Sequence, residues 1–502
     1  MKVNCYTIII MLIASITFAQ NFSQTFDEIQ VSDERGLGMY ISDDGNIYCT
    51  VGLVCQDLTV ACGQVYKFSH MGDLLWSNLL VDSKIINWEN IQIENDSIYV
   101  GAARLQGTND DYCEEIILDP ITGEELTSFK SSYTLGLSLG AFGQLIYNDN
   151  IYMYGFGLTH DPNDSAGPGY IHRMDKQGNY IDHLEYRQDN YNEIYQLMEG
   201  PGEELFFLCS STSHLTDNDD YRLVKYNPET QETSVIKHFP FQSTHSNFPF
   251  YTILSDQFVM TNYIYDYEGI LPPLISMVGL SFEGDSLWQF KVDVGNPFED
   301  LRTYDIYEMT SCANDDVLIC GGFENGDSND AGFIMRISKD GELLWERRYW
   351  SYDNNGGLRD SYLSAVREMP DGSIVAIGGM QQFSELGAEE DFWILKVDEN
   401  GCYKEGEDCD EISTDQWLTS VDDIEANDNL VVYPNPANDR INLKAKSIIT
   451  STTISALDGT ILSIQRHQSK DIRIDIIDYP LGMYYLKIKT DKGEIMKTFV
   501  KH

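Results

Sequence analysis

The chain has 502 residues, of which 42% are hydrophobic and 12% aromatic, so it has enough apolar material for a folded core and is not a disordered protein. The chain has 33 basic and 80 acidic residues, which gives a formal net charge of -47 at pH 7. A surface this acidic excludes nucleic acid and anionic lipid as partners, because both are repelled, and it favours cations or cationic partners. The length allows two or three domains.

The N-terminus has the pattern of a secretory signal peptide. Lys2 precedes an apolar run from Ile8 to Ala14, and the small-residue exit Thr17-Phe18-Ala19 predicts cleavage between Ala19 and Gln20. The run is shorter than the about 20 apolar residues that a membrane anchor needs, and no later segment approaches that length. We therefore expect a secreted mature chain without a transmembrane segment.

Nine of the ten cysteines follow the predicted cleavage site. Near neighbours pair most readily in an oxidising compartment, so disulfides Cys55–Cys62 and Cys402–Cys409 are the candidates. A disulfide Cys312–Cys320, which would link the two ends of one predicted hairpin, and reduced, buried cysteines are the alternatives. No histidine stands at a zinc-like spacing from these cysteines, so we expect no zinc knuckle.

The stretch from Ser364 to Cys402 contains the unit that the chain repeats. Its alternating apolar residues predict strands and tight turns in the order 364–368, Pro370-Asp371-Gly372, 373–378, 392–398 and Asn400-Gly401. β-Branched and aromatic residues between Asp-Gly and Asn-Gly turns are typical of antiparallel hairpins. The unit is therefore a small sheet made of two hairpins.

The same unit occurs seven times. The second turn of each copy carries a glycine, or a threonine in one degenerate copy, at Gly72, Gly123, Gly178, Thr230, Gly284, Gly341 and Gly401. Successive second turns are 51 to 60 residues apart, and a first turn recurs in step with them, as at Asp44-Gly45. A period of this length indicates a propeller or a solenoid. Four strands per copy without helical periodicity predict an all-β fold, a seven-bladed β-propeller over residues 20–402.

Three tryptophans stand at one register just after the second turn, at Trp76, Trp288 and Trp345. A large ring at this position can fill the wedge between neighbouring blades. We expect these residues to be packing residues.

Gly136-Leu137-Ser138-Leu139-Gly140 matches the G-x-S-x-G nucleophile elbow. That motif works only where a strand turns sharply into a helix, whereas a strand is predicted to follow here. We interpret the match as a glycine-spaced connection between blades and assign no catalytic residue.

Acidic residues recur before the third strand of four copies, at Asn109-Asp110-Asp111, Asp219-Asp220, Asn329-Asp330 and Glu389-Glu390-Asp391. A second set precedes the first strand of two copies, at Glu299-Asp300 and Asp360. If the strands run outward in sequence order, both sets open on one face of the ring. Converging carboxylates are the ligands that Ca²⁺ prefers. Since no D-x-D-x-D-G loop is present, a solvated acidic rim and a calcium site both stay open, and no other cofactor is expected.

A long connection, Phe239 to Phe250, is rich in aromatic residues and carries His245. Exposed aromatic rings can stack on sugars, so a glycan contact and ordinary packing are both open for this segment. His160 and His172 show no triad or metal spacing. Glycoside hydrolysis needs two carboxylates close in space, and 80 acidic residues do not single out a pair.

Residues 403–429 are acidic and lack apolar periodicity, which predicts a linker. From Leu430 to His502 the sequence alternates at period two, which predicts a small immunoglobulin-like β-sandwich over 430–502. This part has 11 basic and 7 acidic residues, so its net charge is +4, against -51 for the rest of the chain. The change of sign marks a domain boundary.

The repeat motifs D-G-x-I-V-A-x-G-G and W-I-L-K-V-D-x-N-G-C resemble those of secreted propeller proteins of Bacteroidota-type bacteria. The C-terminal segment is similar to the type IX secretion system C-terminal sorting domain through Tyr433-Pro434-Asn435-Pro436, Leu457-Asp458-Gly459, Gly482-Met483-Tyr484-Tyr485 and the lysine-rich end Lys497–Lys501. The resemblance implies that the type IX machinery is a partner. It also implies that the domain takes the protein across the outer membrane of a Gram-negative cell and is then usually removed, leaving the cargo released or attached to the surface.

Together these patterns predict a binding or scaffold module, exposed on the cell surface or secreted, that recognises a glycan or other polymer, a cation or a surface protein. The alternative is a polysaccharide hydrolase or lyase, which would need several polar groups to converge at the mouth of the channel. We expect a monomer.

Overall fold

The computed structural model describes residues 21–501 apart from 27–33, 55–60, 82–83, 86–89, 105–111, 131–136, 160–166, 189–190, 203, 213–218, 241–249, 265–273, 292–302, 325–329, 353–357, 385–386, 404–408, 410, 419–430, 434–436, 438, 457–460, 478, 481 and 491–493. The segments Ala19-Gln20 and 241–249, and Cys55, thus lie outside the described residues.

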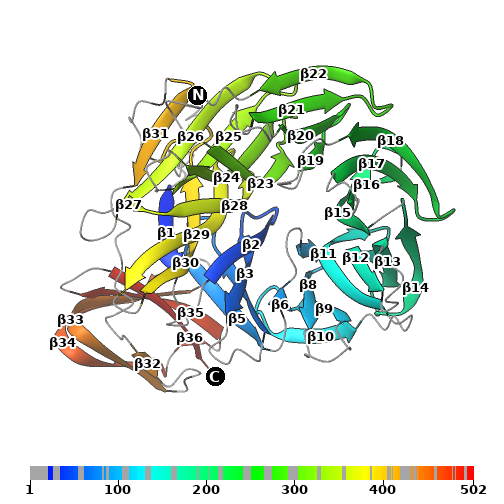
Figure 1. Cartoon of the computed structure of the whole chain (residues 1–502). Helices are drawn as coiled ribbons and strands as arrows, with labels where there is room; N and C mark the ends of the chain where they lie inside the picture. The colour runs from blue at the N-terminus through cyan, green and yellow to red at the C-terminus, as the bar shows by residue number, and fades with distance from the viewer. Residues whose placement is uncertain are drawn as a thin grey trace, which may run out of the picture.

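Seven antiparallel sheets stand around a central axis, and each sheet is one blade (Figure 1). The described residues form no helix, and therefore none with the length and hydropathy of a membrane span. The prediction of an all-β, seven-bladed propeller is confirmed.

The strands of the first four blades are β2 Glu34–Ile41, β3 Ile47–Val54, β4 Ala61–Phe68, β5 Leu74–Val81; β6 Lys84–Ile85, β7 Ile91–Glu94, β8 Ser97–Arg104, β9 Tyr112–Leu118, β10 Glu125–Lys130; β11 Leu137–Tyr147, β12 Asn150–Thr159, β13 Gly169–Asp175, β14 Tyr180–Tyr186; β15 Tyr191–Gly200, β16 Glu204–Thr212, β17 Asp219–Asn227 and β18 Glu232–Pro240. Those of blades 5 to 7 are β19 Tyr251–Ile253, β20 Phe258–Ile264, β21 Leu274–Leu280, β22 Ser286–Lys291; β23 Thr303–Ser311, β24 Val317–Glu324, β25 Asp330–Ile337, β26 Leu343–Tyr352, β27 Leu358–Arg359; β28 Ser361–Glu368, β29 Ile374–Ser384, β30 Gly387–Val397 and β1 Phe22–Phe26.

The seventh blade is completed by the N-terminal strand. Its strand order is β1-β30-β29-β28, so residues 22–26 form the outer strand of a blade whose other strands end at Val397. The Trp393 indole N–H donates to the Ser23 hydroxyl at 3.0 Å. Phe22 packs into the core shared by blades 7 and 1. The two ends of the propeller are therefore joined within one sheet.

Neighbouring blades meet through aromatic rings at the second turns. A Cβ atom added at Gly123 would lie 2.6 Å from the Trp76 ring of the preceding blade. The rings of Trp288 and Trp345 meet Gly341 and Gly401 in the same way. Since these glycines also have positive φ angles, both the close approach and the backbone favour glycine. The three tryptophans are packing residues, as predicted.

The hydrophobic core is divided among the junctions between blades. Val51 and Phe68 of blade 1 share one buried cluster with Ile377 and Phe392 of blade 7. Trp393 of blade 7 lies in a second cluster with residues of blade 6. Full burial of each such side chain is worth about 1.5–3 kcal/mol, so the ring is held together at its junctions.

Strand β31, Ser413–Leu418, lies within the segment predicted to be a linker. It pairs in parallel with β26 on the outside of blade 6. Arg347, which is 1% exposed, donates hydrogen bonds to the carbonyls of Cys409 and Ile412, and Trp350 donates to Asp415 at 2.9 Å. The first part of the acidic segment is therefore docked on the ring, because its carbonyl groups and the Asp415 carboxylate satisfy these buried donors.

The C-terminal domain is a separate sheet assembly beside the ring (Figure 1). Its strands are β32 Val431–Tyr433, β33 Arg440–Ala456, β34 Ile461–Asp475, β35 Gly482–Thr490 and β36 Glu494–Lys501. The long strand β33 pairs with β32, β34 and β35, and the curved sheet encloses a core that includes Ile441, Leu486 and Phe499. The predicted immunoglobulin-like sandwich is confirmed.

Candidate functional site

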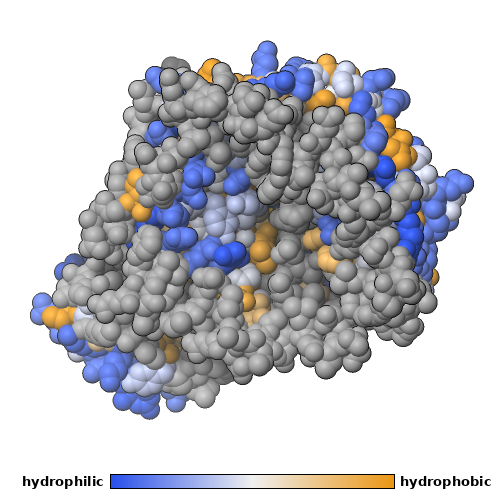
Figure 2. Space-filling view, viewed as in Figure 1, coloured by the Kyte–Doolittle hydropathy of each residue, from blue (hydrophilic) through white to orange (hydrophobic). Residues whose placement is uncertain are grey.

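A central cavity of about 340 Å³ lies where the innermost strands of the blades end. All seven blades contribute to its wall, through Met39, Tyr40, Ile91, Gln92, Leu145, Leu197, Met198, Glu199, Thr252, Ile253, Thr310, Ser311 and Arg367. The centre of the ring is also hollowed in the space-filling view, where hydrophilic and hydrophobic side chains are both visible (Figure 2). A cavity formed by seven converging strands is a place where side chains from distant parts of the sequence can meet one ligand.

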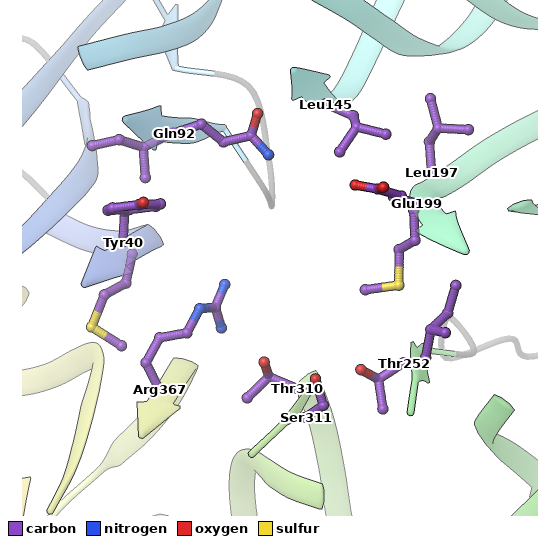
Figure 3. A pocket seen from close by; sticks show the side chains of 13 residues that line it. Tyr40, Gln92, Leu145, Leu197, Glu199, Thr252, Thr310, Ser311 and Arg367 are labelled. Carbon is purple, nitrogen blue, oxygen red and sulfur yellow. The ribbon is translucent and has the colours of Figure 1, made fainter. Parts of the chain in front are cut away.

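Gln92 of β7 is held in a fixed orientation. Its side-chain oxygen accepts a hydrogen bond from the Ile146 backbone N–H at 2.6 Å. The amide nitrogen is therefore the end directed to the cavity (Figure 3). An amide nitrogen only donates, so this wall offers N–H groups to a ligand.

Arg367 of β28 extends its guanidinium group toward the cavity (Figure 3). One of its nitrogens, Nη1, lies 2.6 Å from the Glu308 carboxylate and 2.7 Å from the Val366 carbonyl. Glu308 is 9% exposed and also accepts from the Val366 N–H at 2.8 Å. These contacts hold the guanidinium group through Nη1, so part of its planar fork is already bonded to Glu308 and Val366.

Tyr40 of β2 and Glu199 of β15 add a phenol and a carboxylate to the wall (Figure 3). Burial, and then the nearby Asp43 carboxylate, raise the pKa of Tyr40. The phenol therefore stays protonated near neutral pH, where it donates a hydrogen bond and does not act as a base. The hydroxyls of Thr252, Thr310 and Ser311 complete the polar part of the cavity.

The remaining wall is apolar. Leu145, Leu197, Met198 and Ile253 come from blades 3, 4 and 5, and Met39 and Ile91 come from blades 1 and 2. Polar and apolar groups are mixed in this part of the wall, because Glu199 and Thr252 lie on the same side as Leu197 (Figure 3).

A second polar cluster lies toward the opposite ends of the innermost strands. Arg35 and Glu390 form an ion pair at 2.9 Å, and the rings of Tyr307 and Tyr362 are 5.4 Å apart. Burial is the first cause of the raised pKa of both phenols, and it brings that of Tyr307 to about 12. Both phenols therefore stay protonated near neutral pH, and that of Tyr362 is hydrogen-bonded to Glu390.

Acidic side chains gather at this same end, as the sequence predicts for one face. The Asp330 backbone N–H donates to the Asp360 carboxylate at 3.1 Å. Burial, followed by Asp360, Glu324 and Asp305, raises the pKa of Asp330 to about 6. Asp219-Asp220 begin β17 and Glu389-Glu390-Asp391 lie in β30, whereas Asn109-Asp110-Asp111 and Glu299-Asp300 lie outside the described residues. The described part of the chain has no group of three or more His, Cys, Asp or Glu residues that could hold a metal ion. A calcium site stays a prediction.

Ser138 lies in β11, where it pairs with Leu158 of β12, and no helix follows it. The structure therefore does not form the strand-to-helix elbow that nucleophilic catalysis would need. His172 is 2% exposed in blade 3 and packs among aromatic rings.

The disulfide Cys402–Cys409 is present, as predicted. Cys62 is also disulfide-bonded, and Cys55, its predicted partner, lies outside the described residues. Cys312 and Cys320 are buried and free.

Of the predicted sorting motif, Tyr433, Gly482-Met483-Tyr484-Tyr485 and the lysine-rich end Lys497–Lys501 are described. Tyr433 is 47% exposed on β32, Gly482 begins β35, and Tyr484 is 4% exposed and donates to the Pro480 carbonyl at 2.6 Å. The parts Pro434-Asn435-Pro436 and Gly459 lie outside the described residues.

The sequence did not single out the polar residues of the cavity. Their signal is register: Tyr40, Thr310 and Arg367 each stand four residues before the turn that follows their strand. Side chains at one register of the innermost strands meet at one level of the channel, so an alignment of the seven copies could have found them.

Residues 431–502 match the family model of the secretion system C-terminal sorting domain. Among solved structures, the chain is similar to PorZ, an essential bacterial surface component of the type IX secretion system of Porphyromonas gingivalis, at 10% identity and a TM-score of 0.36, over 92% of this chain and 70% of that one. It is also similar to the polysaccharide lyase Uly1, at 7% identity and a TM-score of 0.46, over 72% of this chain and 90% of that one. A third similar structure is the periplasmic gluconolactonase PpgL of Pseudomonas aeruginosa, at 12% identity and a TM-score of 0.41, over 73% of this chain and 97% of that one.

At these identities the similarity concerns the fold alone. No curated protein matches the chain. The chain is a β-propeller protein that a type IX secretion C-terminal sorting domain directs to the outer-membrane surface or the exterior of the cell.

Proposed function

We propose that the propeller is a binding module that acts outside the cell and holds its ligand in the central cavity. The observation that carries this proposal is the convergence of one or more side chains from every blade on a single cavity, whose polar groups include an amide, hydroxyls, a carboxylate and a guanidinium group. Its volume of about 340 Å³ is at the lower end of the usual range for small-molecule sites.

The chemistry of the wall favours binding over catalysis. Glu199 is the single carboxylate among the thirteen described lining residues, whereas glycoside hydrolysis uses two. Abstraction of a proton in a lyase reaction needs a base, and because the raised pKa keeps Tyr40 protonated near neutral pH, Glu199 is the one carboxylate among the described lining residues that could take that role.

The mature full chain, from Gln20 to His502, can be tested on glycan and peptide arrays with and without a chelator. We expect a ligand to be retained in both conditions and to be lost in Ser311→Trp, because the indole would occupy the cavity. The matched control is Ser286→Trp, an exposed residue of the outer strand β22, which should leave binding unchanged. Loss of binding on chelation would point instead to a calcium-dependent site.

The alternative, a polysaccharide hydrolase or lyase, predicts a different result. Incubation with polysaccharides would then release new reducing ends or unsaturated products, and Ser311→Trp would abolish that release. Turnover of this kind would overturn the binding-module proposal.

A further inference from the structure

We infer that Glu115 and Gln144 form a proton-dependent joint between blades 2 and 3, in which a neutral Glu115 carboxyl donates a hydrogen bond to the Gln144 side-chain oxygen. This inference goes beyond the proposed function and does not depend on the ligand of the cavity. It is carried by two buried acceptor groups that meet at one blade interface, where the described residues place no donor between them.

Gln144 of β11 is fixed in one orientation by the backbone of blade 2. Its amide nitrogen donates to the Tyr99 carbonyl at 3.1 Å and to the Asn90 carbonyl at 3.4 Å. The reverse orientation would place the amide oxygen against two carbonyl oxygens, which only accept hydrogen bonds. The oxygen is therefore the end of the amide that remains, and it has no donor among the described residues although Gln144 is fully buried.

Glu115 of β9 is the second group of this joint. Its side chain is fully buried, and neither carboxyl oxygen has a hydrogen-bond partner of ordinary length in the described part of the chain. The Gln144 side chain acts on it across the interface. An ionised carboxylate only accepts, so it would leave both groups unsatisfied, whereas a protonated carboxyl supplies the donor that the Gln144 oxygen lacks.

The surroundings of Glu115 disfavour its ionised form. Phe129 of β10 is its partner in the ladder, and burial is the largest influence on the carboxyl, whose pKa it raises well above the usual value. Tyr99 of β8 is the other titratable group at the joint, and its pKa is raised first by burial. The charged groups that act on Tyr99 are the cation Lys176 and the carboxylates Glu94, Glu115 and Asp149.

The joint lies next to the wall of the central cavity. Gln144 is followed in β11 by Leu145, which lines the cavity. The next residue is Ile146, whose backbone N–H orients the Gln92 side chain at 2.6 Å. A hydrogen bond from Glu115 to Gln144 therefore helps to hold this part of the wall in place.

The sign of the pH dependence follows from the raised pKa. The folded state binds the Glu115 proton more tightly than the unfolded chain does, where a glutamic acid titrates near pH 4. The stabilisation is therefore complete below that pH and is lost as the pH rises through the pKa of the folded state. Glu115→Gln should remove this dependence, because an amide N–H group donates to Gln144 at every pH.

Differential scanning calorimetry of the mature full chain at pH 5 and at pH 8 tests the inference. We expect the ring transition of Glu115→Gln to lie close to that of the unmodified protein at pH 5 and about 2 °C or more above it at pH 8. The matched control is Glu125→Gln, an exposed glutamate of the neighbouring strand β10. It should leave the difference between the two pH values unchanged.

Glu115→Leu separates the hydrogen bond from burial alone, because leucine fills the site without a donor. Its ring transition should lie below that of Glu115→Gln at both pH values. Hydrogen exchange followed by mass spectrometry should also show several-fold faster exchange of the segment that contains Ile146 in Glu115→Leu than in Glu115→Gln.

Equal loss of stability with rising pH in the unmodified protein and in Glu115→Gln would overturn the inference. So would equal stability and exchange in Glu115→Leu and Glu115→Gln. An ionised Glu115 that held a buried cation would give the opposite result, since Glu115→Gln, or EDTA added to the unmodified protein, would then lower the transition at pH 8. Each of these results leaves the binding-module proposal standing.

Discussion

The Asp330 carboxyl makes a pH-dependent contribution at the residue scale. Its pKa is raised to about 6, first by burial and then by the Asp360, Glu324 and Asp305 carboxylates. In the unfolded chain an aspartate titrates near pH 4. The folded state therefore binds a proton more tightly, so stability is highest below about pH 4 and is lost as the pH rises through 6.

We predict that Asp330→Asn stabilises the protein above pH 6 and has no such effect at pH 4, because the asparagine acquires no charge. Solvent screening of this exposed group limits the gain to about 1 kcal/mol in the free energy of unfolding. Urea denaturation at pH 4 and at pH 7.5 would measure both values. Asp340→Asn, in an exposed turn of the same blade, is the control, and an equal gain in both variants would contradict the prediction.

The roles of some single residues could be predicted from the sequence, as for the packing tryptophans, whereas the roles of the cavity residues could not. The role of Trp288 was predictable because one ring recurs at the same place in three copies and meets a turn glycine there. Gln92 and Arg367 were not, because the groups that orient them, the Ile146 N–H and Glu308, belong to other strands. Contacts of that kind follow from tertiary packing and leave no local pattern.

Strand β1 is the element on which closure of the ring depends. Phe22 is 7% exposed and packs against the second turn of blade 1, where a Cβ atom on Gly72 would lie 2.7 Å from its ring. Five residue pairs register β1 on β30, from Phe22 with Lys396 to Phe26 with Phe392. A short strand thus holds two distant parts of the sequence together.

We predict that Phe22→Ala lowers the free energy of unfolding by about 3 kcal/mol, because it leaves a cavity at the junction of blades 7 and 1. The midpoint of chemical denaturation and the rate of proteolysis would measure the loss. Leu126→Ala, on the outer strand β10 with 57% exposure, should cost less than about 0.5 kcal/mol. Comparable losses in the two variants would show that β1 does not stabilise the closed ring.

Elements made from neighbouring residues were predictable, and those made from distant ones were not. The hairpins follow from turns such as Asp371-Gly372, whose residues fix the local backbone. Strand β1 has its partner 370 residues away, counted between Ser23 and Trp393. Strand β31 is short and lies in an acidic segment, and tertiary contacts with the β26 edge, with the buried Arg347 and with Trp350 explain why it is ordered.

At the scale of the whole molecule, the ring and the C-terminal domain have separate cores. The cluster that includes Ile441, Leu486 and Phe499 contains no described residue of the ring, whereas β31 belongs to blade 6. We predict that a mature chain ending at Asn429 keeps the thermal transition of the ring within about 2 °C and loses one smaller transition. Differential scanning calorimetry of this chain and of the full mature chain would measure both, and a fall of more than about 5 °C would contradict the prediction.

The joint between β1 and β30 has a consequence for biogenesis. A nascent polypeptide emerges N-terminus first, so residues 22–26 appear long before the segment with which they pair. Closing a loop of 370 residues costs roughly 4 kcal/mol more chain entropy than closing a five-residue turn. We therefore expect the ring to close only after translation has delivered the final hairpin of blade 7.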